Sequence, residues 1–396
     1  GRPPIVVVPF EVLDTEARSR SLAETLTEEV LIELDEHELF VIATETRGDA
    51  ADGATARASA GSAGYVLSGS VRALPGTIRI TARVVLAATG TQIWSARFDE
   101  PRSIETTRAG QERVARAIAA VAAPYGPVFD AELTRLAAAP PERRSLSECM
   151  LDYYEYRRDL DAAHHAVALR CIERVIQDEP ESATAWATLS LLLTEAFGFA
   201  YDSADVTGTA TLDRAREAAR TAMDIDGENV FANLALARVQ FFSRAEFRGT
   251  AEQVLARRPN NTEVLSLVGA MSAPAGDASR GRPLFERAIE LSPRPPPTYY
   301  GGLAFALLAS REYDEALAAA LRMDSPNWVS GNAILASVAA LAGREDIAVR
   351  ARDRQRELSA TQGQDPRAVL ARWPMHEALR TELLRGLEAA ERIGAQ

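Results

Sequence analysis

The sequence contains no lysine, and all 44 of its basic residues are arginine. A P-loop needs a lysine on the nucleotide phosphates, a protein kinase needs one on a strand, and Schiff-base enzymes need an amine. These three enzyme classes are therefore excluded for this segment. Acidic residues outnumber basic ones, and the formal net charge is -12. Since nucleic acid binds basic surfaces, we expect no direct nucleic-acid contact by this segment.

Cysteine and histidine are scarce as well. Cys149 and Cys171 fall in two expected helices, without a CxxC pattern or a histidine spacing of the metal-binding kind. We interpret both as small core residues, and the alternative is a disulfide between neighbouring helices, which would indicate an oxidising compartment. Only His164 and His165 are adjacent histidines, and adjacent side chains on a helix point about 100° apart. We therefore expect no metal site.

Long apolar runs and catalytic motifs are also missing. No stretch approaches about 18 uninterrupted apolar residues, so we expect no membrane span in this segment. The chain starts almost at once with the apolar run 5–10 and lacks a signal peptide, which suggests a piece of a longer protein. HExxH, GxGxxG and nucleophile-elbow patterns do not occur. We expect no catalytic residues, no cofactor and no enzymatic activity.

A regular spacing of helix-ending residues runs through the C-terminal two thirds of the sequence. Pro180, Gly227, Pro259, Pro293 and Pro326 follow one another at intervals of 47, 32, 34 and 33 residues. Each closes a helical pattern, and the next pattern begins a few residues later. A period of about 34 residues with two helices per unit predicts a stack of helix-turn-helix repeats. Such stacks are usually binding surfaces.

The N-terminal part has a different pattern. Alternating apolar residues bounded by turn residues indicate strands, and apolar residues at helical spacing indicate helices between them. Proline followed by glycine at Pro75 and Gly76 indicates a tight turn between two strands. The expected elements are strand 5–10, helix 18–36, strand 39–43, a loop with a weak helix at 46–64, strands 65–74, 77–86 and 92–98, and helix 103–122.

Several blocks of this part resemble the TolB-amino-terminal-like domain. The blocks are residues 6–10, 26–30, 65–72, 79–85, 88–91 and 93–98. In bacterial regulators this domain precedes tetratricopeptide (TPR) repeats. It usually follows a class III adenylate cyclase domain or an OmpR-type (CadC-like) winged-helix domain. The resemblance therefore implies an α/β domain with a mixed sheet and an output domain upstream. Ser68 departs from the family, which commonly has Glu there.

The repeat region in turn resembles TPR units, because small residues recur where two helices would meet. Gly269, followed by Phe285 and Ala288, is one example. We expect the α+β class, with an N-terminal α/β domain followed by an all-α TPR-type solenoid. The expected boundaries are a TolB-like domain at 1–124, a linking helix or linker at 125–144, about six TPR-like hairpins at 145–360 and a capping helix at 361–396.

Candidate binding residues follow from the TPR resemblance. TPR stacks usually bind along the concave surface that the first helix of each unit forms. Aromatic and arginine side chains are enriched at the energetic centres of interfaces, and arginine can hold a carboxylate with two hydrogen bonds. Alignment of the repeats places on that side Tyr153, Arg157, Leu191, Phe231, Arg238, Phe241, Glu263 and Phe305.

One repeat is longer than the others. The unit from Thr184 carries about 13 extra residues at 197–209, which predict an inserted loop at the edge of the stack. Such insertions often carry binding, and the alternative is a flap that buries its own aromatic residues. The candidates in this loop are Phe197, Phe199 and Tyr201, together with Asp202 and Asp205.

We therefore expect a non-catalytic sensory or protein-binding region of a bacterial signalling or transcription-regulatory protein. It would bind a protein, a peptide or a small ligand in the TPR groove and pass the signal to an N-terminal output domain. One alternative is a structural scaffold without a switching role, and another is an enzyme of unrecognised type. The expected compartment is the cytoplasm, or the periplasm if a membrane span precedes residue 1. The oligomeric state is left open, and a homodimer is one option.

Overall fold

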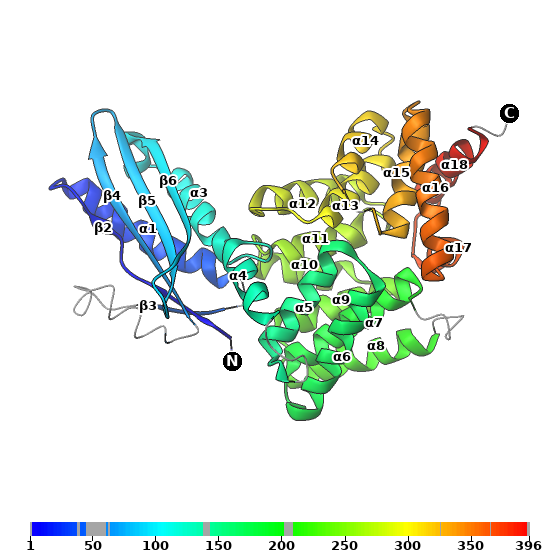
Figure 1. Cartoon of the computed structure of the whole chain (residues 1–396), viewed down its shortest axis with the longest axis horizontal. Coiled ribbons are helices and arrows are strands. Elements are labelled where there is room, and N and C mark those ends of the chain that lie inside the picture. The colour runs from blue at the N-terminus through cyan, green and yellow to red at the C-terminus, as the bar shows by residue number, and fades with distance from the viewer. Residues whose placement is uncertain are drawn as a thin grey trace. The chain divides into compact units, whose positions relative to one another are not determined.

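The computed structural model describes residues 2–37, 40–44, 61, 64–137, 143–201, 209–324, 326–364 and 366–393. The chain forms two compact units, which are Gly1–Pro140 with Leu291–Arg294, and Pro141–Glu290 with Pro295–Gln396. We call them the α/β unit and the helical unit (Figure 1). One combines a mixed sheet with helices and the other is all-helical, so the expected α+β class is confirmed.

The sheet of the α/β unit has the strand order β3-β1-β4-β5-β6, and the short β2 pairs with β4. β1 is parallel to β3 and β4, whereas β4, β5 and β6 form an antiparallel meander. The strands are β1 (Pro4–Val7), β2 (Glu11–Val12), β3 (Val41–Thr44), β4 (Tyr65–Leu74), β5 (Thr77–Leu86) and β6 (Gln92–Pro101).

Two helices, α1 (Ala17–Asp35) and α3 (Arg108–Ala119), cover one face of this sheet (Figure 1). The alternation of the strands explains this, since Ile78, Ile80 and Val84 of β5 are fully buried while the exposed Arg83 points away. The remaining elements of the unit are α4 (Pro127–Leu136) and the 3-10 turns η1 (Arg102–Glu105) and η2 (Ala120–Ala122).

The expected strands and helices of this unit are present with small shifts at their ends. The helix expected at 103–122 is divided into η1, α3 and η2. The segment 125–144, expected as a linking helix or linker, contains the helix α4, which belongs to the α/β unit because its Glu132 accepts a hydrogen bond from Tyr65. The loop with a weak helix expected at 46–64 lies outside the described residues, apart from Gly61 and Gly64.

In the helical unit, the described helices α5 to α16 pair as successive hairpins, and α17 and α18 follow them. The hairpins are α5 (Leu146–Asp159) with α6 (Ala162–Asp178), α7 (Ala183–Phe199) with α8 (Thr209–Ile225), α9 (Val230–Phe242) with α10 (Arg248–Arg257), α11 (Thr262–Ser272) with α12 (Ala278–Leu291), α13 (Pro297–Ala309) with α14 (Tyr313–Leu321), and α15 (Val329–Leu341) with α16 (Glu345–Gln362); α17 is Pro366–Arg372 and α18 is Glu377–Arg392.

Local sequence signals define the helix ends. All five helix-ending residues singled out from the sequence lie in connections between consecutive helices, as expected. Polar residues begin the helices that follow three of them: the side chains of Ser182, Asn229 and Asn261 accept hydrogen bonds from backbone N–H groups of α7, α9 and α11. These caps satisfy donors that the first turn of a helix leaves without partners.

Small residues allow neighbouring hairpins to approach closely. Phe285 of α12 is buried between Gly269 of α11 and Gly302 of α13. A Cβ atom added at Gly269 would lie 3.0 Å from the Phe285 ring, and one added at Gly302 would lie 2.1 Å from it. An aromatic ring of the second helix therefore fills the space left by glycines on the first helices of two successive units.

The first helices of the hairpins form the interior of the unit. α7 and α9 are buried on nearly every side, and Thr298 of α13 donates a hydrogen bond to the Arg157 carbonyl oxygen of α5. The chain folds back after α17, where the Trp373 indole N–H donates to the Gly198 carbonyl oxygen at 2.9 Å. The segment around Trp373 therefore covers the side that the first helices share. No described helix is long and apolar enough to cross a membrane.

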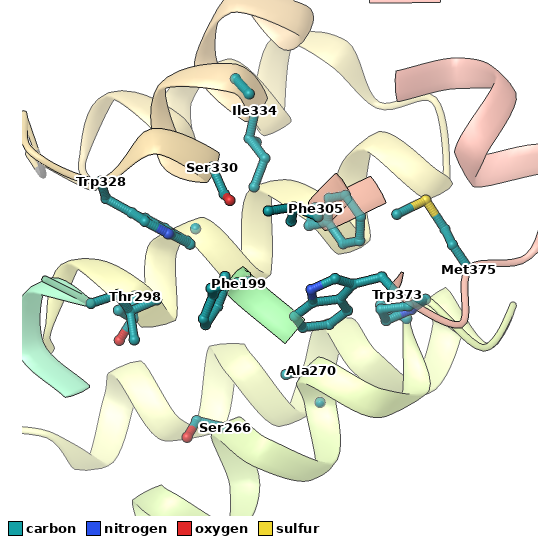
Figure 2. Close-up of a pocket in the computed structure, with 18 of the residues that line it drawn as sticks. Phe199, Ser266, Ala270, Thr298, Phe305, Trp328, Ser330, Ile334, Trp373 and Met375 are labelled. Carbon is teal, nitrogen blue, oxygen red and sulfur yellow. The ribbon is translucent and has the colours of Figure 1, made fainter. Parts of the chain in front are cut away.

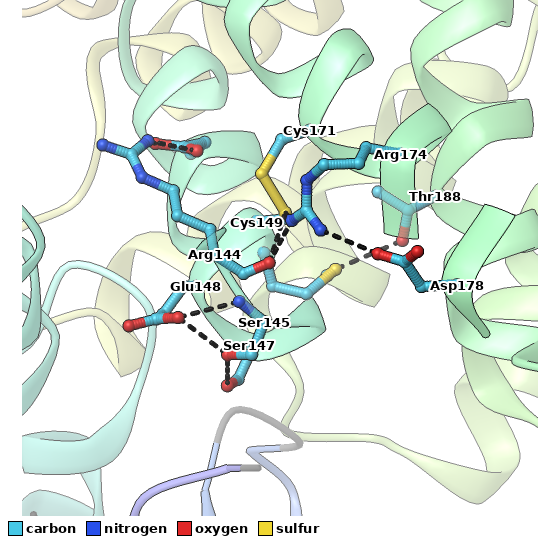
Figure 3. The surroundings of a disulfide bond; sticks show 11 residues. Arg144, Ser145, Ser147, Glu148, Cys149, Cys171, Arg174, Asp178 and Thr188 are labelled. Carbon is cyan, nitrogen blue, oxygen red and sulfur yellow. Dashed lines mark hydrogen bonds and ion pairs between the residues drawn. A yellow bond between two sulfur atoms is a disulfide. The ribbon is translucent and has the colours of Figure 1, made fainter. Parts of the chain in front are cut away.

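Cys149 of α5 and Cys171 of α6 form a disulfide, with 5.5 Å between their Cα atoms (Figure 3). The interpretation of both as unpaired core residues is therefore wrong, although both are buried. The helices were expected, but which of their faces meet depends on the geometry of the hairpin. Arg174 lies beside the bond: its guanidinium donates to the Arg144 carbonyl oxygen and pairs with Asp178.

Candidate functional site

A cluster of ionisable side chains is buried among the first helices of the helical unit. Arg157 of α5 donates to Glu195 of α7 at 2.5 Å and to Glu263 of α11 at 3.2 Å. The Tyr153 hydroxyl donates to the same Glu263 oxygen at 2.7 Å. Together with Arg238 of α9, these residues form what we call the charged cluster. Four helices contribute to it, so their packing determines its geometry.

Arg238 differs from Arg157 in having no acceptor. Its side chain is 2% exposed, and its Nε and Nη1 atoms are buried. Among the described residues its guanidinium makes no hydrogen bond or ion pair, and it lies 5.0 Å above the Phe242 ring and 5.4 Å from the Trp373 ring. One oxygen of Glu195 and one of Glu263 also have no donor within this part of the chain. The cluster therefore has unused hydrogen-bonding capacity.

Burial shifts the proton equilibria of this cluster. It lowers the pKa of Arg238 to about 10, which still leaves a cation at neutral pH. Burial also raises the pKa of Glu263 and raises that of the Tyr153 hydroxyl well above its usual range. Each shift has the same cause, since a low-dielectric interior disfavours the charged form. A buried cation without an acceptor is costly, and its presence calls for an explanation.

A pocket opens beside the charged cluster, with a cavity volume of about 130 Å³. Arg157 and Arg238 belong to its lining, whereas no aspartate or glutamate in the described part of the chain does. Figure 2 shows the rings of Phe199, Trp328 and Trp373 around a common space. The indole N–H of Trp328 is a second buried donor for which the described residues provide no acceptor. The wall is thus aromatic and apolar, with cationic and N–H donors and no carboxylate.

The C-terminal segment forms one side of this pocket. Trp373 packs against Phe199, Phe241 and Phe242, with ring centroids 5.3–6.1 Å apart. Leu383 of α18 is also part of the lining. The pocket is therefore built from α5, α7, α9, α11, α12, α13 and α15 together with α17, α18 and the segment between these two.

The residues expected on a concave binding surface lie largely in the interior. Tyr153, Arg157 and Glu263 are brought into direct contact, and Arg157, Arg238 and Phe305 line the pocket. Seven of the eight are buried, and Phe305 is half-buried; the buried ones are Tyr153, Arg157, Leu191, Phe231, Arg238, Phe241 and Glu263. Leu191 and Phe231 do not line the pocket. The binding role of this set remains a prediction, and its members do not form an open groove.

The inserted loop expected at 197–209 begins later than predicted. Phe197 and Phe199 belong to the last turn of α7 and are buried, because the apolar helix continues through them. Tyr201 follows the helix and donates a hydrogen bond to the Leu160 carbonyl oxygen at 2.6 Å. Asp202 and Asp205 lie outside the described residues. The structure therefore contradicts the assignment of Phe197 and Phe199 to a loop.

Glu195, Trp328 and Trp373 were not among the sequence-based candidates. Glu195 had a signal, since it is the only acidic residue in the apolar stretch that became α7. Trp328 and Trp373 had no such signal in the sequence, because their place in the pocket wall depends on how the last segment of the chain folds back. Among the described residues, no group of three or more histidine, cysteine, aspartate or glutamate side chains is arranged to hold a metal ion.

No protein-family model matches the chain, and the resemblance of residues 4–124 to the TolB-amino-terminal-like domain remains a prediction. The putative adenylate cyclase 3 of Rhizobium meliloti (strain 1021) is 28% identical over 239 residues. This similarity covers 53% of the present chain and 38% of that protein, so the chain spans well under half of the relative's length.

Comparison with solved structures found distant similarities, one of them to a protein described as a TPR protein. YrrB, described as a TPR protein with an unusual peptide-binding site, is 16% identical with a TM-score of 0.31, covering 50% of this chain and 96% of its own. PilW, a type IV pilus biogenesis factor, is 16% identical with a TM-score of 0.35, covering 64% and 97%. Yeast Tom70 is 14% identical with a TM-score of 0.35, covering 74% and 61%.

Proposed function

We propose that this chain is the non-catalytic interaction and sensing region of a bacterial signalling protein. Its helical unit receives a ligand or partner and acts on an output domain elsewhere in the protein. The observation that carries the proposal is the pocket among the first helices, whose lining includes the buried guanidinium of Arg238 without an acceptor. Purely structural packing gains nothing from leaving such a group without a partner.

The similarity to a putative adenylate cyclase supports a nucleotide cyclase as the output domain. A winged-helix DNA-binding domain is the other candidate, from the TolB-like resemblance of residues 4–124. A ligand controls either output only if it binds two arrangements of the protein with different affinity. The buried charged cluster suits such coupling, because it joins four helices of the stack and a bound anion would change its balance of charge.

The full-length protein that contains this chain provides the test. We expect Arg238→Met to change the rate of cyclic nucleotide synthesis, or the affinity for promoter DNA if the output is a winged helix. The exposed Arg220→Met on α8 serves as the control and should change neither. Outputs that are identical for both variants and the parent protein would remove the sensing role and favour a structural scaffold.

For the compartment, the Cys149–Cys171 disulfide supports the periplasm over the cytoplasm, because disulfides persist in oxidising compartments. Because both cysteines are buried, the test is alkylation of cells that are quenched with acid and then denatured. Cys149 and Cys171 that become alkylated only after reduction support the periplasm. Alkylation without reduction supports the cytoplasm.

A further inference from the structure

The pocket of the helical unit combines features that together select a ligand chemistry. Its walls are apolar and aromatic, and two kinds of buried donor, the Arg238 guanidinium and the Trp328 indole N–H, have no acceptor among the described residues. Among the described residues, no carboxylate belongs to the lining, because Glu195 and Glu263 are outside it. A complementary ligand therefore carries a negative, acceptor-rich group and an apolar body.

The size of the cavity limits that body. An apolar cavity of about 150 Å³ in another protein accommodates one benzene molecule, and the present cavity measures about 130 Å³. A single ring or a branched aliphatic chain of similar volume fits this space. A peptide would need a groove that continues beyond the pocket, and the hydrogen bond from Trp373 to Gly198 closes one side. Size and closure favour a small free molecule.

We propose that this pocket binds a small monocarboxylic acid, with its carboxylate on Arg238 and its ring or branched chain among Phe199, Phe305 and Trp328. The acid supplies the acceptors that Arg238 lacks and neutralises a buried charge, so both the polar and the apolar parts gain from binding. This inference names the ligand class for the sensing role proposed above and rests on it.

The competing explanation for Arg238 is a bound water that connects it to Glu195. Coulombic attraction between these two residues is present, but no ion pair forms between them. Water would satisfy the donors without selecting for an anion. The two explanations differ in one measurable property, because only the acid site distinguishes a carboxylate from its neutral amide.

Isothermal titration calorimetry of the 396-residue chain tests the proposal with phenylacetate and 4-methylpentanoate, each taken to about 10 mM. We expect saturable binding of at least one acid, and binding of phenylacetamide at least about tenfold weaker than that of phenylacetate. Arg238→Met should weaken acid binding at least about tenfold, whereas Arg220→Met should leave it unchanged. Trp328→Phe, which removes the second donor and keeps an aromatic ring, should weaken it less.

Folding of the variants is controlled separately. Arg238→Met replaces a guanidinium that lacks an acceptor among the described residues by an apolar chain, so its melting temperature should stay close to that of the parent chain. Equal affinity for phenylacetate and phenylacetamide, undiminished acid binding by Arg238→Met, or no binding of either acid would each overturn the proposal. Tighter binding of a short peptide ending in phenylalanine would overturn it in favour of a peptide carboxylate. Acid binding without any change in output would leave the site intact and refute the sensing role.

Discussion

Each unit of the molecule buries a carboxylate or guanidinium in contact with other polar side chains, and the two cases differ in how many of the hydrogen bonds are made. In the α/β unit, both oxygens of the buried Glu132 have donors, Tyr65 at 2.5 Å and Arg135 at 2.8 Å, and Arg135 keeps 46% of its side chain exposed. In the helical unit, Arg238 is fully buried and lacks an acceptor.

We interpret this difference between Glu132 and Arg238 as one between a structural role and a proposed binding role. A buried carboxylate with all its hydrogen bonds made, and with its cation reaching water, stabilises the contact between β4 and α4 without further partners. A buried cation that lacks an acceptor costs free energy, and an anion that pairs with it would offset this cost. The buried guanidinium of Arg238, for which the described residues provide no acceptor, therefore supports our proposal that the helical unit is the part that binds.

Glu263→Ala has the largest effect we expect. It removes the acceptor of Tyr153 and one of the two carboxylates that neutralise Arg157, so the helical unit should lose about 3–5 kcal/mol of its free energy of unfolding. Glu132→Ala should cost the α/β unit less, about 1–3 kcal/mol, because Tyr65 alone is left without an acceptor. Urea unfolding followed by hydrogen exchange of peptides from each unit measures both. Equal losses would contradict the distinction between the two groups.

Loss of the disulfide should act on the helical unit alone, since the chain has no cysteines besides Cys149 and Cys171. The cross-link spans 22 residues, for which the chain-entropy model gives about 3 kcal/mol of stabilisation. We expect reductant to lower the unfolding free energy of the helical unit by this amount and to leave the α/β unit unchanged. The Cys149→Ser, Cys171→Ser double variant should already be weakened and should not respond to reductant.

Acid should destabilise the α/β unit through His37. Burial lowers the pKa of this side chain from 6.5 to about 4, so between these two pH values the unfolded chain binds a proton that the folded chain does not. Stability is therefore complete above about pH 6.5 and falls by up to about 3 kcal/mol as the pH decreases towards 4. His37→Leu should remove this part of the pH dependence in paired urea titrations at pH 7 and 4.5.

The helical unit contains a comparable residue. Burial also lowers the pKa of His165, while the hydrogen bond to the Leu192 carbonyl oxygen opposes the shift. Acid should therefore weaken both units in the same direction. A pH dependence of the α/β unit that is unchanged in His37→Leu would show that another group controls it.

Gly302→Ala has the smallest effect of the series, about 1–3 kcal/mol of destabilisation. The added methyl group would meet the Phe285 ring at 2.1 Å, and Phe285 cannot retreat because Gly269 lies close on another side. Gly249→Ala is the matched control, since nothing lies within 4 Å of its Cβ position; there alanine should be neutral or slightly stabilising. Thermal unfolding by circular dichroism compares the two, and equal melting temperatures would contradict the close contact.

Much of the fold could be predicted because its signals are local. Strands β4 to β6 follow from alternating residues and from the turn at Pro75 and Gly76, and the helix ends follow from residues such as Pro259 and Pro326. The predictions that were wrong depend on how helices pack against one another. The pairing of Cys149 with Cys171 depends on which helix faces meet, and the end of α7 at Phe199 depends on tertiary burial that favours continuing the helix.

The candidate site could be predicted in part for the same reason. Repeat alignment found Arg157, Arg238 and Glu263, because corresponding positions on the first helices face the same side. It did not reveal that this side is closed by the chain itself, since curvature and the fold-back at Trp373 are set by the sum of many packing angles. The sequence thus located these residues, and the structure showed that they are buried in the interior, where Arg157 and Arg238 line a pocket.

The fold-back at Trp373 also bears on how the helical unit unfolds. In an open repeat stack each unit touches only its neighbours, so the ends can fray independently of the middle. Here Trp373 and Arg372 donate hydrogen bonds to Gly198 and Phe197, 175 residues earlier in the chain. The last segment is thus fastened to the second hairpin, and the hairpins between them cannot open one after another from that end. We therefore expect the hairpins between α7 and Trp373 to unfold together rather than one by one.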